Sequence, residues 1–186
     1  KIIEEIDTQK ITLIKRKNRG LGSACMLGLL YSKGENICWI DSNLPDLAEK
    51  IPAMISKLNK ENIVIMSRYV DGGGDLRSFQ RILSSKIINY ICRFFLDKKI
   101  KDYTSGIFAI KKNFLIDNVP ISYGHGEYFI ELLYKASKNN YDIVELPYIQ
   151  PPDIEGLSKT ASSFIGFFKL GFQYIVRIIN CRIRPN

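Results

Sequence analysis

The chain has 186 residues, of which 46% are hydrophobic and 25% are charged, and its net charge is +8. These proportions are ordinary for one folded globular domain, and they exclude a disordered or low-complexity chain. The positive charge favours an anionic partner, such as a nucleotide, a nucleic acid or an acidic membrane surface. The four cysteines match no zinc-binding pattern. A disulfide framework is not expected in a chain of this length, so a reducing cytosol is the simplest expectation.

Short apolar runs alternate with segments of helical periodicity along the chain. The predicted strands are 11–15, 36–41, 62–66, 107–110 and 141–147, and the predicted helices are 20–32, 47–59, 78–96, 126–138 and 161–184. Segments 71–75 and 150–159 are predicted loops, the first of them flexible. This alternation predicts an α/β fold with a mainly parallel sheet covered by helices on both faces. The chain starts without methionine or a capping sequence, so we expect further residues and part of the sheet upstream.

The apolar faces of two predicted helices follow helical spacing. The helix at 20–32 has Ala24, Leu27, Leu30 and Tyr31 on one face, and the helix at 78–96 has Phe79, Ile82, Leu83, Ile87, Ile91 and Phe94 at helical spacing.

The segment 36–43 is the most informative part of the sequence. Its apolar run 37–40 predicts a buried central strand, and Asp41 follows where ligands bind in open α/β sheets. Before it, Gly20 and Gly22 open a helix whose N-terminus suits an anion. Two interpretations remain from these residues alone. Either a phosphate-bearing molecule lies beside Asp41, or the glycines only permit a turn and Asp41 caps the next element, because the spacing does not match the dinucleotide motif.

Seven short motifs follow one another in a fixed order, and this ordered set identifies a protein family more specifically than any single motif does. They are segments 18–24, 40–43, 66–69 with 72–74, 80–81, 102–106, residue Glu131, and segment 156–160. As a set they resemble the family-2 glycosyltransferases, above all the branch of dolichol-phosphate mannosyltransferases and polyprenyl-phosphate glycosyltransferases. The resemblance covers about 11–160. It implies a GT-A fold, with a Rossmann-like catalytic domain at 1–160 whose first strands lie upstream, followed by an amphipathic helix at 161–186.

The function that this resemblance implies is inverting glycosyl transfer. A hexose would move from a nucleotide diphosphate sugar, GDP-mannose or a UDP-sugar, to polyprenyl or dolichyl phosphate at the cytoplasmic face of a membrane. A phosphate monoester is largely dianionic at neutral pH, so this acceptor scarcely needs a base. Catalysis would depend on alignment and on neutralising the leaving diphosphate. No nucleic-acid partner is expected, and the oligomeric state is left open.

The resemblance also implies the residues of the site. Asp41 matches the first carboxylate of the family's acidic motif and Asn43 stands at the second, so both are predicted ligands of Mg²⁺ or Mn²⁺. The predicted catalytic residues are Asp102, Arg81 and Lys159. The predicted nucleotide-sugar ligands are Asn18, Gly20, Gly22, Asp41, Arg68, Ser105 and Ser158.

Three departures from the family pattern leave a second function open. Asn43 is neutral, Pro45 offers no side-chain ligand, and Asp153 replaces a usual basic residue. The alternative is a non-catalytic sugar-nucleotide-binding domain with a degenerate metal site. Glu131 has a structural or a sugar-orienting role, and His125 is interpreted as a turn or surface residue. A nucleic-acid-binding domain ranks last, because only the charge suggests it.

The last predicted helix is amphipathic. Its polar residues form a narrow stripe, and its other residues form a wide apolar face. This pattern predicts a helix that lies at a membrane surface, while docking on the chain's own domain remains the alternative. The polar residues are Lys169, Gln173, Arg177, Asn180 and Arg184.

Overall fold

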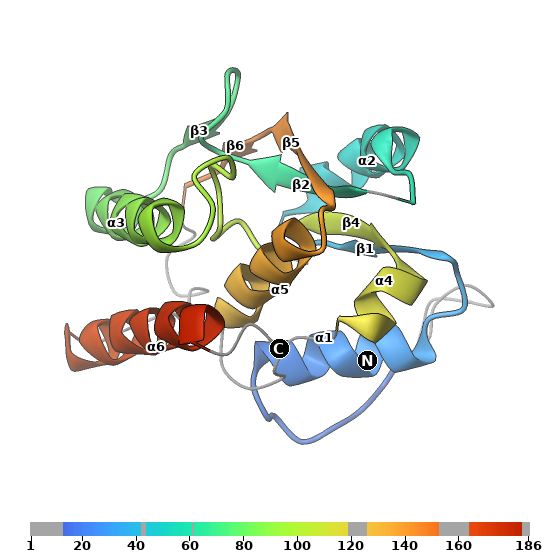
Figure 1. The fold of residues 1–186 in the computed structure, drawn as a ribbon, viewed down its shortest axis with the longest axis horizontal. Helices are drawn as coiled ribbons and strands as arrows, with labels where there is room; N and C mark the ends of the chain where they lie inside the picture. Colours follow the sequence, from blue (N-terminus) through green and yellow to red (C-terminus); the bar gives the residue numbers. More distant parts are fainter. Residues whose placement is uncertain (1–12, 42–43, 61, 119–125, 153–163, 184–186) are drawn as a thin grey trace.

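The computed structural model describes residues 13–41, 44–60, 62–118, 126–152 and 164–183 (Figure 1). The strands are β1 (Asn36–Trp39), β2 (Asn62–Ser67), β3 (Gly74–Asp75), β4 (Phe108–Lys111), β5 (Asp142–Pro147) and β6 (Ile149–Gln150). The helices are α1 (Leu21–Tyr31), the 3₁₀ helix η2 (Pro45–Lys50), α2 (Ile51–Lys57), α3 (Phe79–Phe95), α4 (Lys112–Asp117), α5 (Glu127–Lys138) and α6 (Phe164–Ile183). The predicted helix at 47–59 is thus η2 followed by α2, whose first turn contains Pro52. There, proline's missing N–H costs no hydrogen bond.

The main sheet has the order β1-β4-β2-β5. Strands β1, β2 and β5 point the same way, and β4 runs antiparallel between β1 and β2. The sheet is therefore mainly parallel, as predicted. Phe108 of β4 pairs with both Trp39 of β1 and Ile65 of β2. This register brings the carboxyl ends of β1, β2 and β5 to the same edge as the start of β4, and we call this edge the carboxyl edge.

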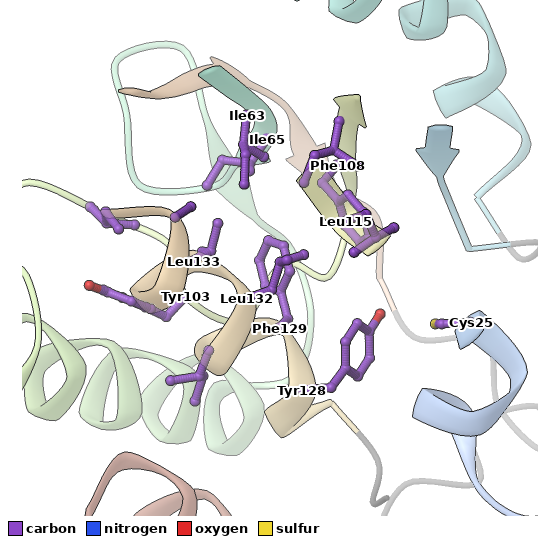
Figure 2. Packing of buried hydrophobic residues seen from close by; sticks show 14 of the residues in the cluster. Cys25, Ile63, Ile65, Tyr103, Phe108, Leu115, Tyr128, Phe129, Leu132 and Leu133 are labelled. Carbon is purple, nitrogen blue, oxygen red and sulfur yellow. The ribbon is translucent and has the colours of Figure 1, made fainter. Parts of the chain in front are cut away.

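Two apolar clusters cover the two faces of the sheet. Successive side chains of a strand point to opposite faces. Ile63 and Ile65 of β2 accordingly join the cluster with α1, α4 and α5 (Figure 2), whereas Val64 and Met66 join the cluster with η2 and α2. Helices therefore pack on both faces, as the α/β pattern predicts.

The position of β1 differs from the prediction of a central strand. Among the described residues β1 lies at one end of the sheet, and its side chains are only partly buried. The strand predicted at 11–15 is also absent from the part that the structure describes, since 13–15 have no regular structure and Leu13 is 46% exposed. A strand requires a hydrogen-bonded neighbour, and no described segment pairs with these residues.

The segment at 71–75 was predicted as a flexible loop, but it is tied to the end of β5. Gly73 N donates to Val70 O (2.9 Å) and Gly74 N donates to Tyr148 O (3.0 Å). Strand β3 then pairs in parallel with β6. A Cβ at position 73 would lie 2.8 Å from backbone atoms of Arg68 and Ser67, so only glycine fits there.

The apolar face of α1 points in a different direction from the predicted one. Helix α1 buries Gly22, Cys25 and Leu29, while Leu30 and Tyr31 are exposed. The hydroxyl of Tyr128 on α5 points toward Cys25 (Figure 2), and Cys25 and Leu29 pack in the apolar cluster with α4 and α5.

The polar stripe predicted for the last helix does not lie wholly in solvent. Arg177 is buried and forms an ion pair with Glu131 of α5, so it faces the protein. Gln173 and Asn180 are exposed, and the side chains of Lys169 and Arg184 lie outside the described residues. In the described part of the chain, no helix combines the length and hydrophobicity needed to span a membrane.

Candidate active site

Three of the predicted site segments meet at the carboxyl edge of the sheet. Asp41 follows β1 by two residues, Arg68 directly follows β2, and 102–106 comes just before β4. Because β1 and β2 both pair with β4 near Phe108, these segments lie at the same edge despite their distance in sequence. Asp41 is exposed there, whereas Asp102 is fully buried.

Arg68 and Asp102 form a two-pronged ion pair. Arg68 Nε donates to Asp102 Oδ2 (2.8 Å) and Arg68 Nη2 donates to Asp102 Oδ1 (2.8 Å), while the backbone N–H of Arg68 also donates to Oδ2 (3.0 Å). Burial alone would lower the pKa of Arg68, but the Asp102 carboxylate outweighs it and raises the pKa, so Arg68 is cationic. Both oxygens of Asp102 are occupied, so the carboxylate serves here to hold Arg68.

A second acid–base pair surrounds the same arginine. Asp75 accepts hydrogen bonds from Arg77 Nε (2.8 Å) and Nη2 (2.6 Å), and it lies 3.5 Å from Arg68 Nη1. Burial of Asp75 by itself would raise its pKa, but hydrogen bonds and charges from Arg77, with the charge of Arg68, lower it. Two carboxylates and two guanidinium groups therefore neutralise one another at the end of β2.

The loop at 101–106 is held by side chains from other elements. Glu145 of β5 accepts hydrogen bonds from the backbone N–H groups of Lys101 (2.8 Å) and Asp102 (3.0 Å). Asn89 of α3 accepts one from Tyr103 N (2.5 Å). The loop is thereby fixed between a strand and a helix before β4 begins.

Ser105 lies in this loop and has an unsatisfied hydroxyl. Its Oγ is buried and has no hydrogen-bond partner among the described residues. Gly106, which follows it, has a φ of 71°, a conformation that favours glycine. A buried hydroxyl normally finds a partner, and a ligand role for Ser105 remains a prediction.

The predicted residues before α1 build its first turn. Asn18 Oδ1 accepts a hydrogen bond from Gly20 N (3.1 Å), and Gly20 has a φ of 89°. Gly22 is buried within α1. These contacts agree with the interpretation that the glycines permit a turn, and a ligand role for these residues remains a prediction.

The other predicted residues divide into two groups. Arg81 lies in the first turn of α3 and is half-buried. Glu131 contacts Arg177 of α6 and Lys135, which supports its structural alternative. The remaining residues lie outside those that the structure describes: Asn43, Ser158, Lys159, His125 and Asp153.

The metal site predicted at Asp41 and Asn43 can be tested on Asp41 only. The described residues contain no cluster of three or more His, Cys, Asp or Glu side chains suited to a metal. Mg²⁺, however, is commonly bound by one or two carboxylates together with substrate phosphates. Asp41 therefore fits a cation that a bound diphosphate also ligates, and a separate protein cage is not required.

Cys25, near the carboxyl edge, is not a candidate nucleophile. Burial raises the pKa of its thiol to about 12, so it is protonated at neutral pH.

Sequence analysis did not identify several residues that organise this site. Asn89 lies in the middle of a helix, where asparagine is unfavourable, and Glu145 is a charge between the apolar residues Val144 and Leu146 of a strand. These two irregularities are the signals that could have found them. Asp75 and Thr104 carry no such signal, because their partners are identified only by the fold.

Comparisons with known proteins agree with this architecture. The family model described as glycosyl transferase family 2 matches residues 1–118. The chain is 31% identical over 173 residues to a dolichol-phosphate mannosyltransferase of Pyrococcus furiosus, which covers 90% of this chain and 47% of that protein. It is 27% identical over 168 residues to the polyprenol monophosphomannose synthase of Mycolicibacterium smegmatis, covering 86% of this chain and 63% of that protein.

A solved structure shares the fold. Glucosyl-3-phosphoglycerate synthase from Mycobacterium tuberculosis, in complex with uridine diphosphate, superposes with a TM-score of 0.62 at 16% identity, over 91% of this chain and 57% of that one. The chain thus spans roughly half the length of the proteins that it matches.

Proposed function

The chain belongs to glycosyl transferase family 2, and on that premise we propose that it transfers a hexose from a nucleotide diphosphate sugar to a polyprenyl phosphate. The observation that carries the proposal is the meeting of Asp41, Arg68 and Ser105 at the carboxyl edge of the sheet, from three separate segments. The similarity to a dolichol-phosphate mannosyltransferase and a polyprenol monophosphomannose synthase supports this choice of acceptor and makes GDP-mannose the first donor to test, before UDP-sugars.

The proposed reaction is a single displacement. An oxygen of the acceptor phosphate attacks the anomeric carbon from the face opposite the leaving group. The bond between that carbon and the nucleoside diphosphate breaks, giving a glycosyl phosphodiester of inverted configuration. The acceptor is already an anion, so no side chain has to remove a proton. This agrees with an Asp102 whose oxygens both bind Arg68.

The side chains of the site act by binding and orientation. Arg68 is held as a cation by Asp102, and Arg81 and Lys159 supply further positive charge for the phosphates. Asp41, with Asn43, is proposed to ligate Mg²⁺ or Mn²⁺, which when bound neutralises negative charge on the diphosphate. Ser105 Oγ is proposed to contact the donor, because it is buried without a partner in the described residues.

One observation weakens Arg68 as a phosphate ligand, and the departures at Asn43, Pro45 and Asp153 keep the non-catalytic alternative open. Arg68 donates to Asp102 and Thr104 and lies against Asp75, so most of its donors are already used. A radiolabelled donor incubated with polyprenyl phosphate separates the two functions. Transfer of label to extractable lipid supports the enzyme. Donor binding by calorimetry without any transfer supports the binding domain.

The site of action is proposed to be the cytoplasmic face of a membrane, reached through α3 and α6. Helix α3 exposes a row of large apolar side chains at helical spacing. On its opposite side, Asn89 and Cys92 are buried. The exposed row is Phe79, Leu83, Ile87, Tyr90 and Phe94, with exposures of 76%, 45%, 50%, 71% and 73%. A helix of a globular protein normally buries such a row. We therefore expect this face to bind an apolar partner.

Helix α6, which lies beside α3 (Figure 1), also exposes a row of apolar side chains. It turns Arg177 inward to Glu131 and leaves apolar residues outside. The exposed apolar residues of its described part are Phe172, Ile175, Val176, Ile179 and Ile183. We call the two rows together the α3–α6 face.

The charge of these helices supports an anionic bilayer as the proposed partner. Neither α3 nor α6 contains an acidic residue, and Lys86, Arg93 and Arg182 are exposed on them. Interfacial helices gain from burying apolar side chains and from cations near anionic lipid, each cation contributing about 1 kcal/mol. A docked enzyme would meet a lipid phosphate at the bilayer surface, and tethering by segments outside this chain is compatible with such docking.

Vesicle sedimentation tests the α3–α6 face. We expect the intact protein to sediment with vesicles that contain phosphatidylserine, and Phe94→Glu with Phe172→Glu to weaken this at least tenfold without loss of the cooperative melt. Leu30→Glu is the matched control, because Leu30 is 77% exposed on α1. If the wild type ignores such vesicles at low salt, or forms a dimer that the double variant dissociates, the face does not bind a bilayer.

A further inference from the structure

Four successive backbone N–H groups, from Lys101 to Thr104, each donate to a side-chain oxygen. The first two donate to Glu145, the third donates to Asn89 and the fourth donates to Asp102 Oδ1 (3.0 Å). Backbone groups in loops usually bond to water or to other backbone. We call the loop at 101–104 with its acceptors Asn89, Asp102 and Glu145 the loop clamp.

Asn89 holds the loop with both ends of its amide. Its Oδ1 accepts from Tyr103 N, and its Nδ2 donates to Thr104 Oγ1 (2.8 Å) and to the carbonyl of Ser85 (2.8 Å). The residue is 4% exposed. A buried amide satisfied on both sides fixes the distance and orientation between α3 and the loop.

The contact with Thr104 extends to Arg68. Thr104 Oγ1 accepts from Asn89 Nδ2 and from Arg68 Nη2 (2.6 Å), which uses both of its lone pairs. Its own proton is then directed to Ser85 Oγ (2.9 Å) or Asp102 Oδ1 (3.3 Å). Asn89 thereby orients a hydroxyl that in turn orients the guanidinium of Arg68, although it does not touch Arg68 itself.

Glu145 holds the loop from the opposite side. It pairs with Ile65 across the parallel ladder of β5 and β2, so its backbone is rigid. Its two carboxylate oxygens each accept one N–H, from Lys101 and from Asp102. The loop is therefore fixed between α3 and β5, one residue before Ser105, whose hydroxyl has no hydrogen-bond partner in the described part of the chain.

We propose that Asn89 and Glu145 are positioning residues, which set the geometry of Arg68, Asp102 and Ser105 for the transfer reaction. This rests on the proposed function. Sites of this kind lose rate when their supporting residues are removed, because small displacements of aligned groups weaken the transition state more than the bound ground state. Asn89 also belongs to α3, whose other side forms part of the α3–α6 face.

The test is the separation of kcat from KM for glycosyl transfer by the intact protein. Asn89→Ala removes both contacts, and Asn89→Asp keeps the volume and the acceptor for Tyr103 N but removes the donor to Thr104. Glu145→Gln leaves one oxygen acceptor for two N–H groups. We expect kcat to fall about 10- to 100-fold in each, with the donor KM within about threefold of wild type. The measurement is made well below each variant's melting temperature.

Two matched controls separate positioning from general damage. Ser84→Ala removes a hydroxyl of α3 whose hydrogen bond, among the described residues, stays within the helix, to Gln80 O. Asp142→Asn removes an exposed charge from the same strand as Glu145. Both are expected to keep the wild-type kcat.

The outcomes distinguish the two proposals. A wild type that transfers no sugar overturns the proposed function. An active wild type whose folded variants retain its kcat overturns the positioning role alone, even if their melting temperatures fall. If Asn89→Ala does not fold by circular dichroism, Asn89→Asp and the partly exposed Glu145→Gln decide the question.

Discussion

At the scale of single residues, the candidate active site is a set of buried charges that compensate one another. Arg68 lies between Asp102 and Asp75, and Arg77 holds the far side of Asp75. Removing one member of such a set leaves another buried and uncompensated, which costs more than the pair contributes. The cluster therefore behaves as a unit, and a change in the charge of one member changes the stability of the others.

The pH dependence of stability tests Asp75. Hydrogen bonds and charges from Arg77 and Arg68 outweigh burial and lower the pKa of Asp75. A carboxyl with a lowered folded-state pKa contributes stability above its unfolded value of about 3.9 and loses it as pH falls through the folded value. We therefore expect Asp75→Asn to lower the free energy of unfolding by about 2 kcal/mol at pH 7, with a difference that shrinks below about pH 4.

Urea unfolding at several pH values measures this difference. Asp71→Asn, an exposed aspartate of the same segment, is the control and should change little. If Asp75→Asn lowers the free energy of unfolding by the same amount at pH 7 and at pH 3.5, the arginines do not stabilise the charge of the Asp75 carboxylate.

Only part of this residue network could be predicted from the sequence. Arg68 and Asp102 stand at positions where a strand ends and a strand begins, and their positions at the carboxyl edge agree with the resemblance to the family. Their mutual ion pair could not be predicted, because it joins residues 34 positions apart through the placement of β4 between β1 and β2. Periodicity indicates an element's type but not its neighbours.

At the scale of elements, α6 is attached to the domain by a buried ion pair. Arg177 binds Glu131 of α5, and Lys135 lies 3.3 Å from the same carboxylate. Tyr174 also packs against the start of α5, where a Cβ at Gly126 would overlap its hydroxyl. Arg177 of α6 thus faces the protein together with Ile178 and Cys181, whereas Gln173, Asn180 and several apolar side chains of α6 are exposed.

Substitution of Arg177 tests this attachment. Arg177→Met should lower the free energy of unfolding by about 3 kcal/mol, because Glu131 stays buried and loses its buried guanidinium partner. Adding Glu131→Gln should restore part of the loss. Arg182→Met, on the exposed side of α6, should change it by less than about 0.5 kcal/mol. Equal losses for the two arginine variants would mean that Arg177 does not attach the helix.

The type of an element could be predicted where its hydrophobic pattern extends over many residues. Which face of the element is buried could not be predicted. The helices α3 and α5 and the strand β2 follow their predicted ranges closely. The two-residue strands β3 and β6 and the short α4 are too brief to give a pattern. The apolar row of α3 has helical spacing, but spacing cannot tell a core-facing row from a partner-facing one.

At the scale of the whole molecule, the candidate active site and the α3–α6 face share one helix. Asn89 on the inner side of α3 holds the loop at 101–104, while Tyr90 and Phe94 are exposed on its outer side. The net charge of +8 suits both the phosphates of the proposed substrates and an anionic bilayer. A lipid-phosphate acceptor would connect the two surfaces.

The most direct test of the central claim is transfer of radiolabelled hexose to polyprenyl phosphate by the intact protein, compared with two variants. Asp41→Ala removes the exposed carboxylate at the carboxyl edge, and Asp46→Ala removes an exposed carboxylate of η2 as the control. The account predicts labelled lipid from wild type and Asp46→Ala, and a loss of at least about 100-fold for Asp41→Ala. Labelled lipid formed equally well by Asp41→Ala, or no labelled lipid from the wild type with any donor, would contradict it.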